Sequence, residues 1–179
     1  LIGLCLVAAY RLLGAGWLIF KTEGALQLQA VAWARSSLWL TAGGIGAISL
    51  ATPLVSSRIF AKWFSFPEII WLAPLPLVSA LLIGLLWRML QRLPADNDRL
   101  AWFPFAAATL LMVLGFSGMA YSFYPFIVPE SLTIADAAAS PESLFIILIG
   151  TMVVLPVIAL YTAVAYAVFR GKATQLSYD

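Results

Sequence analysis

Long uninterrupted runs of apolar residues occupy most of the chain, and polar positions gather in the segments between them. Five of these runs are long enough to cross a hydrocarbon core of about 30 Å, which takes roughly 20 helical residues. No run shows the period-two alternation of apolar and polar side chains that is typical of a membrane β-strand. The pattern therefore predicts an all-α fold, a polytopic bundle of transmembrane helices. The predicted spans cover about residues 1–20, 36–55, 69–87, 100–123 and 143–169.

The composition excludes an ordinary soluble domain. Of the 179 residues 63% are apolar and 10% are charged, whereas about a quarter of the residues in a soluble domain are charged. The net charge of +2 is too small and too dispersed for nucleic-acid binding, so we expect no nucleic-acid partner. We expect residues 1–179 to form a single membrane domain. Because the first residue is not methionine and already lies in an apolar run, we expect the C-terminal part of a longer subunit.

Lysine and arginine residues in the connections predict the orientation, because cytoplasmic loops retain an excess of them. Two of these residues, Arg58 and Lys62, lie between the second and third spans. The connections on the opposite side carry seven: Lys21, Arg35, Arg88, Arg92, Arg99, Arg170 and Lys172. We therefore expect a cytoplasmic C-terminus and an outside loop between the fourth and fifth spans.

The residue types leave little room for catalysis by this chain alone. Histidine, the usual ligand of haem and a frequent ligand of copper and iron, is absent from the sequence. The single cysteine, Cys5, lies in an apolar run, so we expect a buried structural thiol. No nucleotide-binding loop, nucleophile elbow or zinc-binding helix motif occurs. We expect no catalytic residue, no haem ligand and no metal ligand in this chain.

The segment between the fourth and fifth spans is predicted to be ordered. Thr133 and Asp136 have the spacing of a capping box around one short helical turn. Ser140 followed by Pro141 is typical of a helix start, with serine as the N-cap and proline at the first helical position. We expect Asp136 to accept hydrogen bonds from nearby backbone or to pair across an interface rather than to carry protons.

Arg11 is the only charged residue inside any of the five predicted spans. Ten residues separate it from Lys21, which places it about 15 Å deep at the helical rise of 1.5 Å per residue. A guanidinium at that depth costs about 3 kcal/mol or more unless it meets acceptors, so we expect it to face protein or an internal water rather than lipid tails. The alternative is that the first span begins later or tilts, which leaves Arg11 near an interface.

Short runs spread from the first span to the tail resemble the subunit II family of cytochrome bd and cyanide-insensitive quinol oxidases. Each run alone is a weak signal, whereas their joint occurrence is specific. The matching runs are Leu12-Leu13-Gly14-Ala15, Lys21-Thr22-Glu23-Gly24, Tyr124-Pro125 to Val128-Pro129, Ser131-Leu132-Thr133-Ile134, Asp136-Ala137-Ala138, Ser140-Pro141, Ser143-Leu144, Leu155-Pro156 to Tyr161-Thr162, and Phe169-Arg170-Gly171-Lys172.

The resemblance implies a haem-free structural and assembly subunit of a respiratory quinol:oxygen oxidoreductase in the bacterial inner membrane. Subunit I of that family holds the b-type and d-type haems and carries the catalytic groups. The resemblance therefore implies subunit I, membrane lipid and quinone or quinol as partners, with a structural quinone or lipid and a small accessory subunit as further candidates. Family members have eight spans, so about three would precede this chain. The candidate structural or interface residues are Arg11, Tyr124, Asp136, Tyr161 and Arg170.

Two other functions remain open on the sequence. Kinked helices and an intramembrane arginine also suit the substrate path of a secondary transporter or channel. Pro74 and Pro76 in the third span and Pro156 in the fifth are the predicted kinks. A membrane anchor of another complex is the third alternative.

Overall fold

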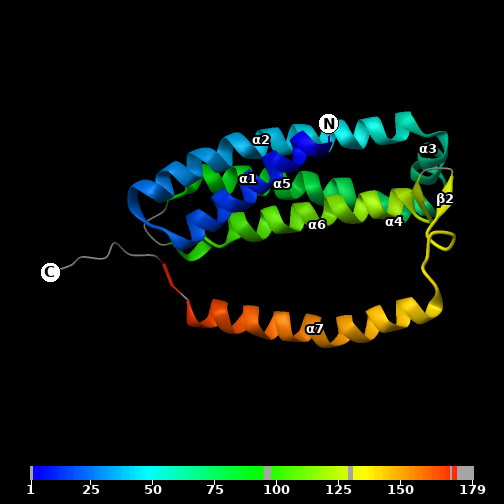
Figure 1. The fold of residues 1–179 in the computed structure, drawn as a ribbon. Coiled ribbons are helices and arrows are strands. Elements are labelled where there is room, and N and C mark those ends of the chain that lie inside the picture. The colour runs from blue at the N-terminus through cyan, green and yellow to red at the C-terminus, as the bar shows by residue number, and fades with distance from the viewer. Residues whose placement is uncertain (1, 95–97, 129–130, 170, 173–179) are drawn as a thin grey trace. The chain divides into compact units, whose positions relative to one another are not determined.

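The computed structural model describes residues 2–94, 98–128, 131–169 and 171–172, and Figure 1 shows that they are mainly helical. The chain divides into two units. Unit 1 comprises Leu1–Ser122 together with Lys172–Asp179, and unit 2 comprises Phe123–Gly171.

Unit 1 is built from four long helices that lie side by side, α1, α2, α5 and α6, with shorter helices at their ends (Figure 1). Its core draws residues from all four long helices. The elements in chain order are α1 (Ile2–Lys21), α2 (Gly24–Val55), α3 (Ser57–Phe64), α4 (Glu68–Leu72), α5 (Pro74–Arg92), the 3-10 turn η1 (Asp98–Leu100) and α6 (Phe103–Phe123).

Unit 2 contains a small β-hairpin followed by one long helix. The strands β1 (Phe126–Val128) and β2 (Leu132–Thr133) pair antiparallel, with Phe126 opposite Thr133. Helix α7 (Pro141–Val168) follows, and none of its residues is buried within unit 2. It continues through Pro156 without interruption, so the predicted kink there does not break the helix.

The predicted fold class is confirmed, since five helices are long and apolar enough to cross a membrane. The second helix differs most from its predicted span, because α2 begins at Gly24 and only Thr22 and Glu23 connect it to α1. The additional turns, Gly24–Arg35, are rich in alanine, leucine and glutamine, which favour helix even where hydropathy is too low for a span.

The third predicted span is divided into α4 and α5 at Ala73. Pro74 occupies the first turn of α5, where its missing N–H is tolerated because no earlier carbonyl in that helix requires it. The predicted loosening at Pro74 and Pro76 is thus confirmed as a division of the helix.

The core of unit 1 fills the half of the bundle that contains the turn between α1 and α2. Trp17 of α1 packs edge-on against Phe105 of α6, with ring centroids 5.0 Å apart. Trp39 of α2 packs in the same way against Trp87 of α5, with centroids 4.9 Å apart. The buried apolar residues of this core are Leu12, Ala15, Ile19, Ala30, Val31, Ala34, Leu38, Leu86, Leu90, Leu93, Ala101, Ala107 and Ala108.

Close backbone approach holds α1 against α6 at Gly16. A Cβ added there would lie 2.9 Å from the backbone nitrogen of Phe105 and 3.0 Å from its Cα. Real Cβ atoms almost never approach other atoms below 3.0 Å, and backbone cannot rotate away as a side chain can. Small residues at helix contacts are a principal source of helix association in membranes, where helices gain little from the hydrophobic effect.

Gly16→Ala should therefore destabilise the protein by about 1–3 kcal/mol, the usual cost of overpacking a close contact. Gly14→Ala is the matched control, because a Cβ at Gly14 would meet nothing within 4 Å. Denaturation of both variants in the same detergent measures the difference. Equal stability of the two variants would contradict the close approach.

Candidate functional site

An apolar cavity of about 380 Å³ lies within unit 1, between α1, α2, α5 and α6, with α3 contributing Trp63. Its lining residues are apolar or carry hydroxyl or thiol groups, and none is charged. It extends along α2 from Thr41 to Thr52, and Ser122 at the end of α6 also lines it. Mainly apolar pockets of about 300–1,000 Å³ are typical of sites for small organic ligands, so the cavity has the dimensions of such a site.

The hydroxyl groups in the cavity wall differ in whether they have a hydrogen-bond partner. Thr52 and Ser79 donate to carbonyl oxygens of their own helices, at 2.7 and 2.8 Å. Thr41 is buried, and its hydroxyl has no hydrogen-bond partner among the residues that the structure describes. Ser37, one turn earlier on α2, is in the same state but does not line the cavity. A buried hydroxyl without a partner is costly, so Thr41 is the polar group in this wall that requires an explanation.

Cys5 lines the cavity from α1 and is half-buried rather than fully buried as predicted. Its Sγ lies where Gly44 of α2 leaves room, since a Cβ on Gly44 would be 2.6 Å from that sulfur. The thiol therefore belongs to a close contact between two helices and faces a cavity as well.

Two hydrogen bonds hold α3 to the C-terminal end of α6. Lys62 Nζ donates to the carbonyl oxygen of Tyr121 at 2.8 Å and lies 4.3 Å from the centroid of the same tyrosine ring. Trp63 Nε1 donates to Ser122 Oγ at 2.9 Å. Since Trp63 and Ser122 both line the cavity, these bonds fix one end of it.

The sequence analysis did not find α3, because eight residues are too few for a membrane span. A signal was present, since Arg58 and Lys62 are four residues apart and so are Ile59 and Trp63, which separates a polar from an apolar helix face. The pKa of Lys62 is lowered from its ordinary value. Burial is the largest cause, and the positive charge of Arg58 lowers the pKa further, while the negative charge of Glu68 raises it.

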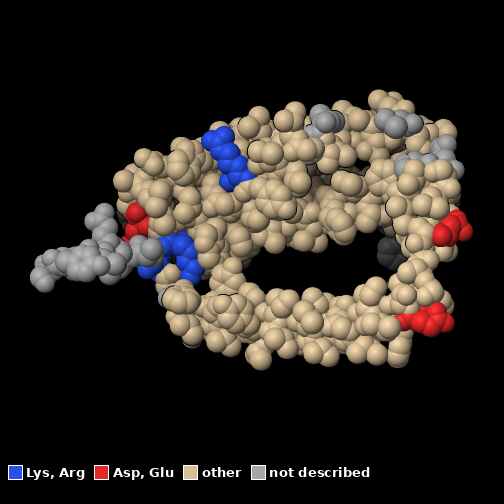
Figure 2. Space-filling model, viewed as in Figure 1, with Lys and Arg blue, Asp and Glu red and all other residues tan. Residues whose placement is uncertain are grey.

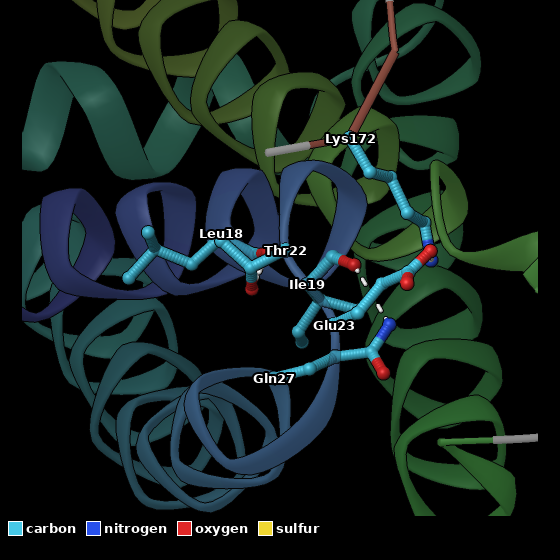
Figure 3. A network of polar contacts seen from close by, with 6 residues as sticks. All are labelled: Leu18, Ile19, Thr22, Glu23, Gln27 and Lys172. Carbon is cyan, nitrogen blue, oxygen red and sulfur yellow. Dashed lines mark hydrogen bonds and ion pairs between the residues drawn. The ribbon is translucent and has the colours of Figure 1, made fainter. Parts of the chain in front are cut away.

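A polar network surrounds the turn between α1 and α2, as Figure 3 shows. The hydroxyl of Thr22 and the side-chain amide of Gln27 donate to carbonyl oxygens in the last turn of α1, at 2.7 and 3.1 Å. Glu23 pairs with Lys172, with 3.5 Å between Oε1 and Nζ. The two partners of the ion pair come from opposite ends of the sequence.

Each partner of this ion pair adjoins a glycine with positive φ. Gly24 follows Glu23 with φ of 65°, and Gly171 precedes Lys172 with φ of 110°. L-residues with a side chain rarely adopt such angles, so glycine permits the backbone at both positions. These four residues lie in two of the runs that carry the family resemblance, and the ion pair joins Glu23 of one run to Lys172 of the other.

The loop of unit 2 confirms the predicted hydrogen bonding of Asp136. Its Oδ2 accepts bonds from Thr133 Oγ1 at 2.6 Å and from the Thr133 backbone N–H at 3.4 Å, while the Asp136 N–H donates to Thr133 Oγ1 at 3.2 Å. The Ala137 N–H donates to the Thr133 carbonyl at 3.1 Å, which closes the predicted single turn. The carboxylate is therefore engaged in ordering the loop.

Helix α7 begins at Pro141, as predicted, with Ser140 at the N-cap position. The Ser140 side chain makes no capping hydrogen bond to the helix backbone. Its Oγ lies instead 3.2 Å from Ser143 Oγ, and one of the two hydroxyls donates to the other.

The five candidate residues from the sequence do not form one described cluster. Arg11 is exposed on α1 in unit 1. Tyr124 and Asp136 are exposed and flank the hairpin of unit 2, whose ends meet where the Ile134 N–H donates to the Pro125 carbonyl at 2.8 Å. Two remain: Tyr161 is exposed on α7, and Arg170 lies outside the described residues.

The donor set of this chain does not fit a haem. The sequence contains no histidine, and its single cysteine is isolated. Among the described residues, no three His, Cys, Asp or Glu side chains gather closely enough to hold a metal ion. Histidine is the most frequent axial ligand of haem iron in proteins, and this chain has none to offer.

Charged groups are scarce along the helices. On the face that Figure 2 shows, mostly uncharged side chains cover the long helices, with one basic side chain among them, and the visible acidic side chains lie near helix ends. The exposed side chains of α7 are almost all aliphatic or aromatic. Surfaces of this kind are stable against hydrocarbon or against other apolar helices.

Comparison with known proteins identifies one family. The family model for cytochrome bd terminal oxidase subunit II matches residues 1–169. Subunit 2 of the cytochrome bd-I ubiquinol oxidase from Escherichia coli strain K12 is 28% identical over 194 residues, covering 90% of this chain and 49% of the relative. The same protein in the O6:H1 and O157:H7 strains gives the same values. The chain thus spans about half the length of the curated relatives it matches.

The matched residues include all five helices that could span a membrane. They also include both the ordered loop and the turn between α1 and α2. The chain belongs to the cytochrome bd terminal oxidase subunit II family.

Proposed function

We propose that this chain is the C-terminal part of a haem-free structural and assembly subunit in a respiratory cytochrome bd quinol:oxygen oxidoreductase of the bacterial inner membrane. The observation that carries the proposal is the family match over residues 1–169, which includes every candidate membrane span. The electron-transfer chemistry belongs to haem groups on subunit I, and this chain supplies no residue to it. Its own residues form one membrane domain that packs against subunit I, lipid and quinone, with a small accessory subunit as a further partner.

Helix α7 supports a role in assembly. It carries 28 residues, none of them buried within unit 2. The side chains of Phe145, Met152 and Tyr161 are each more than 60% exposed. An apolar helix of this kind gains packing contacts when protein or lipid covers it. We propose that the Tyr161 face of α7 and the hairpin residues Tyr124 and Asp136 contribute to subunit contacts, with Asp136 acting as a hydrogen-bond acceptor.

Haem content tests the proposed function. The full-length subunit purified with its partner from native membranes should show the reduced-minus-oxidised bands of b-type and d-type haem. The same subunit produced without subunit I should show none, because the proposal places the haems on subunit I and the residues of this chain offer no imidazole. Absence of haem bands from the co-purified assembly would refute the proposed function, and stoichiometric haem in the isolated subunit would refute the haem-free role.

We propose a cytoplasmic C-terminus from the distribution of basic residues. Arg35 donates from Nε and Nη2 to the Leu90 carbonyl at 3.1 and 2.6 Å, so it lies at the same end of unit 1 as Arg88 and Arg92. The opposite end carries Arg58 and Lys62. An excess of basic residues at one end favours retention of that end in the cytoplasm.

A tag placed after Asp179 should therefore be accessible to an impermeant reagent only after the inner membrane is opened. A tag inserted in the loop near Ser131 is the control and should react from the periplasm. The reverse pattern of accessibility would overturn the proposed orientation.

Arg11 is proposed to meet acceptors that lie outside this chain. It is exposed near the middle of α1, about 15 Å from the Lys21 end at 1.5 Å per residue. A guanidinium facing lipid at that depth costs about 3 kcal/mol, which a protein contact avoids. Carbonyl, hydroxyl or carboxylate oxygens of a neighbouring subunit, a quinone or a lipid headgroup would serve.

Arg11→Leu tests this proposal, because the two possible surroundings of Arg11 predict opposite changes in the stability of the complex. If Arg11 meets acceptors in the assembled complex, the variant leaves them unpaired and should lower stability by about 1–3 kcal/mol. If Arg11 faces lipid, the same change should stabilise the protein. Thermal inactivation of the haem-replete complex measures the direction, with Arg11→Lys expected to retain part of the stability and Leu4→Val, at an exposed position of α1, expected to change little.

A further inference from the structure

Two arginines line a groove at the C-terminal end of α5. The groove has a volume of about 240 Å³, and its lining residues are Leu85, Arg88, Met89 and Arg92. Arg88 and Arg92 are four residues apart, and residues at this spacing are neighbours on one face of a helix. The groove therefore combines two positive charges with apolar side chains in the last two turns of a single helix.

The arginines lie on the face of α5 that points away from the core of unit 1. Leu86 and Leu90 of the same helix are fully buried in that core. Arg88 and Arg92, each two residues further along, are exposed. Two residues correspond to about 200° around a helix of 3.6 residues per turn, so the two pairs occupy opposite faces. The groove thus faces out of unit 1.

Exposed leucines continue the outward face of α5 toward its other end. Leu77, Leu81 and Leu85 are 69%, 62% and 43% exposed, and each is three or four residues from the next member of the row that ends at Arg88 and Arg92. Such spacings keep side chains on one helix face. From Leu77 to Arg92 this face is about 22 Å long at 1.5 Å per residue. It presents a strip of hydrocarbon that ends in two cations.

Aromatic residues place this end of α5 at the edge of the hydrocarbon. Trp87 directly precedes Arg88 and packs against Trp39 of α2. Tryptophan is enriched at the level of lipid headgroups. Helix α5 has 19 residues and is about 28 Å long, close to the hydrocarbon thickness of about 30 Å. Arg88 and Arg92, in its last two turns, therefore lie near the depth of the lipid phosphates.

The two guanidinium groups of the groove have no partner in the part of the chain that the structure describes. No hydrogen bond or ion pair joins Arg88 or Arg92 to another described residue. Arg35 of α2, by contrast, donates to the Leu90 carbonyl, so a different cation already serves the end of α5. The guanidinium fork matches the geometry of phosphate oxygens, which it binds through paired hydrogen bonds. The groove therefore fits an anionic phosphate group.

We propose that this groove binds an anionic phospholipid, whose phosphate contacts Arg88 and Arg92 and whose acyl chain lies along the exposed leucines of α5. The inference rests on the proposed function only in placing the chain in a membrane. A soluble anion would leave the leucine strip uncovered, and a lipid without net charge would leave two cations without a counter-charge. Basic pockets at the ends of transmembrane helices bind anionic headgroups for the same reason.

Charge-removing substitutions test the site in the full-length subunit within its complex. Native mass spectrometry follows titration of the washed complex with dioleoyl phosphatidylglycerol or, separately, with dioleoyl phosphatidylcholine. Arg88→Gln combined with Arg92→Gln should weaken phosphatidylglycerol binding about ten-fold or more, the effect of lost charge-assisted hydrogen bonds, and leave phosphatidylcholine binding unchanged. Arg99→Gln is the matched control, because Arg99 is exposed in η1 and does not line the groove.

A loss of phosphatidylglycerol affinity in the double variant but not in Arg99→Gln supports the site. Unchanged affinity in the double variant overturns it. Displacement of the lipid by an equal concentration of inorganic phosphate also overturns it, because the groove would then be a simple anion site. The haem spectrum of the same samples reports on the proposed function independently.

A second measurement uses the wild-type complex and so does not depend on the folding of a variant. Phenylglyoxal, an uncharged reagent for arginine, should modify Arg88 and Arg92 several-fold more slowly with phosphatidylglycerol than with phosphatidylcholine, and Arg99 equally in both. Peptide mapping identifies the modified residues. Equal reactivity of Arg88 and Arg92 in the two lipids would overturn the proposal. If that equal reactivity is low, acidic groups of a partner subunit occupy the groove instead.

Discussion

The last carbonyl groups of each helix have no hydrogen-bond donor within that helix. A membrane contains little water that could donate to them instead. The polar side chains of unit 1 act at these positions. Thr22 and Gln27 donate to carbonyls at the end of α1, Arg35 donates to Leu90 near the end of α5, and Lys62 donates to Tyr121 near the end of α6. Two of these donors are cations at helix C-termini, where the helix dipole also favours positive charge. The scarce polar residues of this chain thus join one helix to the next.

The scarcity of polar residues also determines how the helices pack inside the bundle. With few polar contacts available between helix centres, association depends on how closely the backbones approach. Gly16 permits that approach to Phe105, and the small residues Ala15, Ala30 and Ala34 fill the core around it. The other half of the contact between α1 and α6 is lined by large and small residues together, and there the helices leave a cavity.

Much of the fold follows from hydropathy, because a run of about twenty apolar residues has few stable conformations in lipid. Helix ends were predictable only where a local signal exists, as at Pro141. The start of α2 at Gly24 was not, since hydropathy describes burial in the membrane and a helix can extend beyond it. The bonded turn at Asp136 was predictable from spacing alone. The pairing of Glu23 with Lys172 was not, since residues 149 positions apart meet only through the fold.

The groups that this chain leaves without a partner identify where further molecules belong. Several carbonyls near helix ends are paired within unit 1, and hydroxyls along the helices mostly donate to their own backbone. Against that background, an exposed arginine in a membrane span, an unpaired threonine in a cavity wall and an apolar helix with no buried residue are exceptions. Each differs in the contact it requires: oxygen acceptors for Arg11, one neutral acceptor for Thr41 and apolar surface for α7. In the proposed assembly role, partners of the subunit would supply these contacts to Arg11, Thr41 and α7.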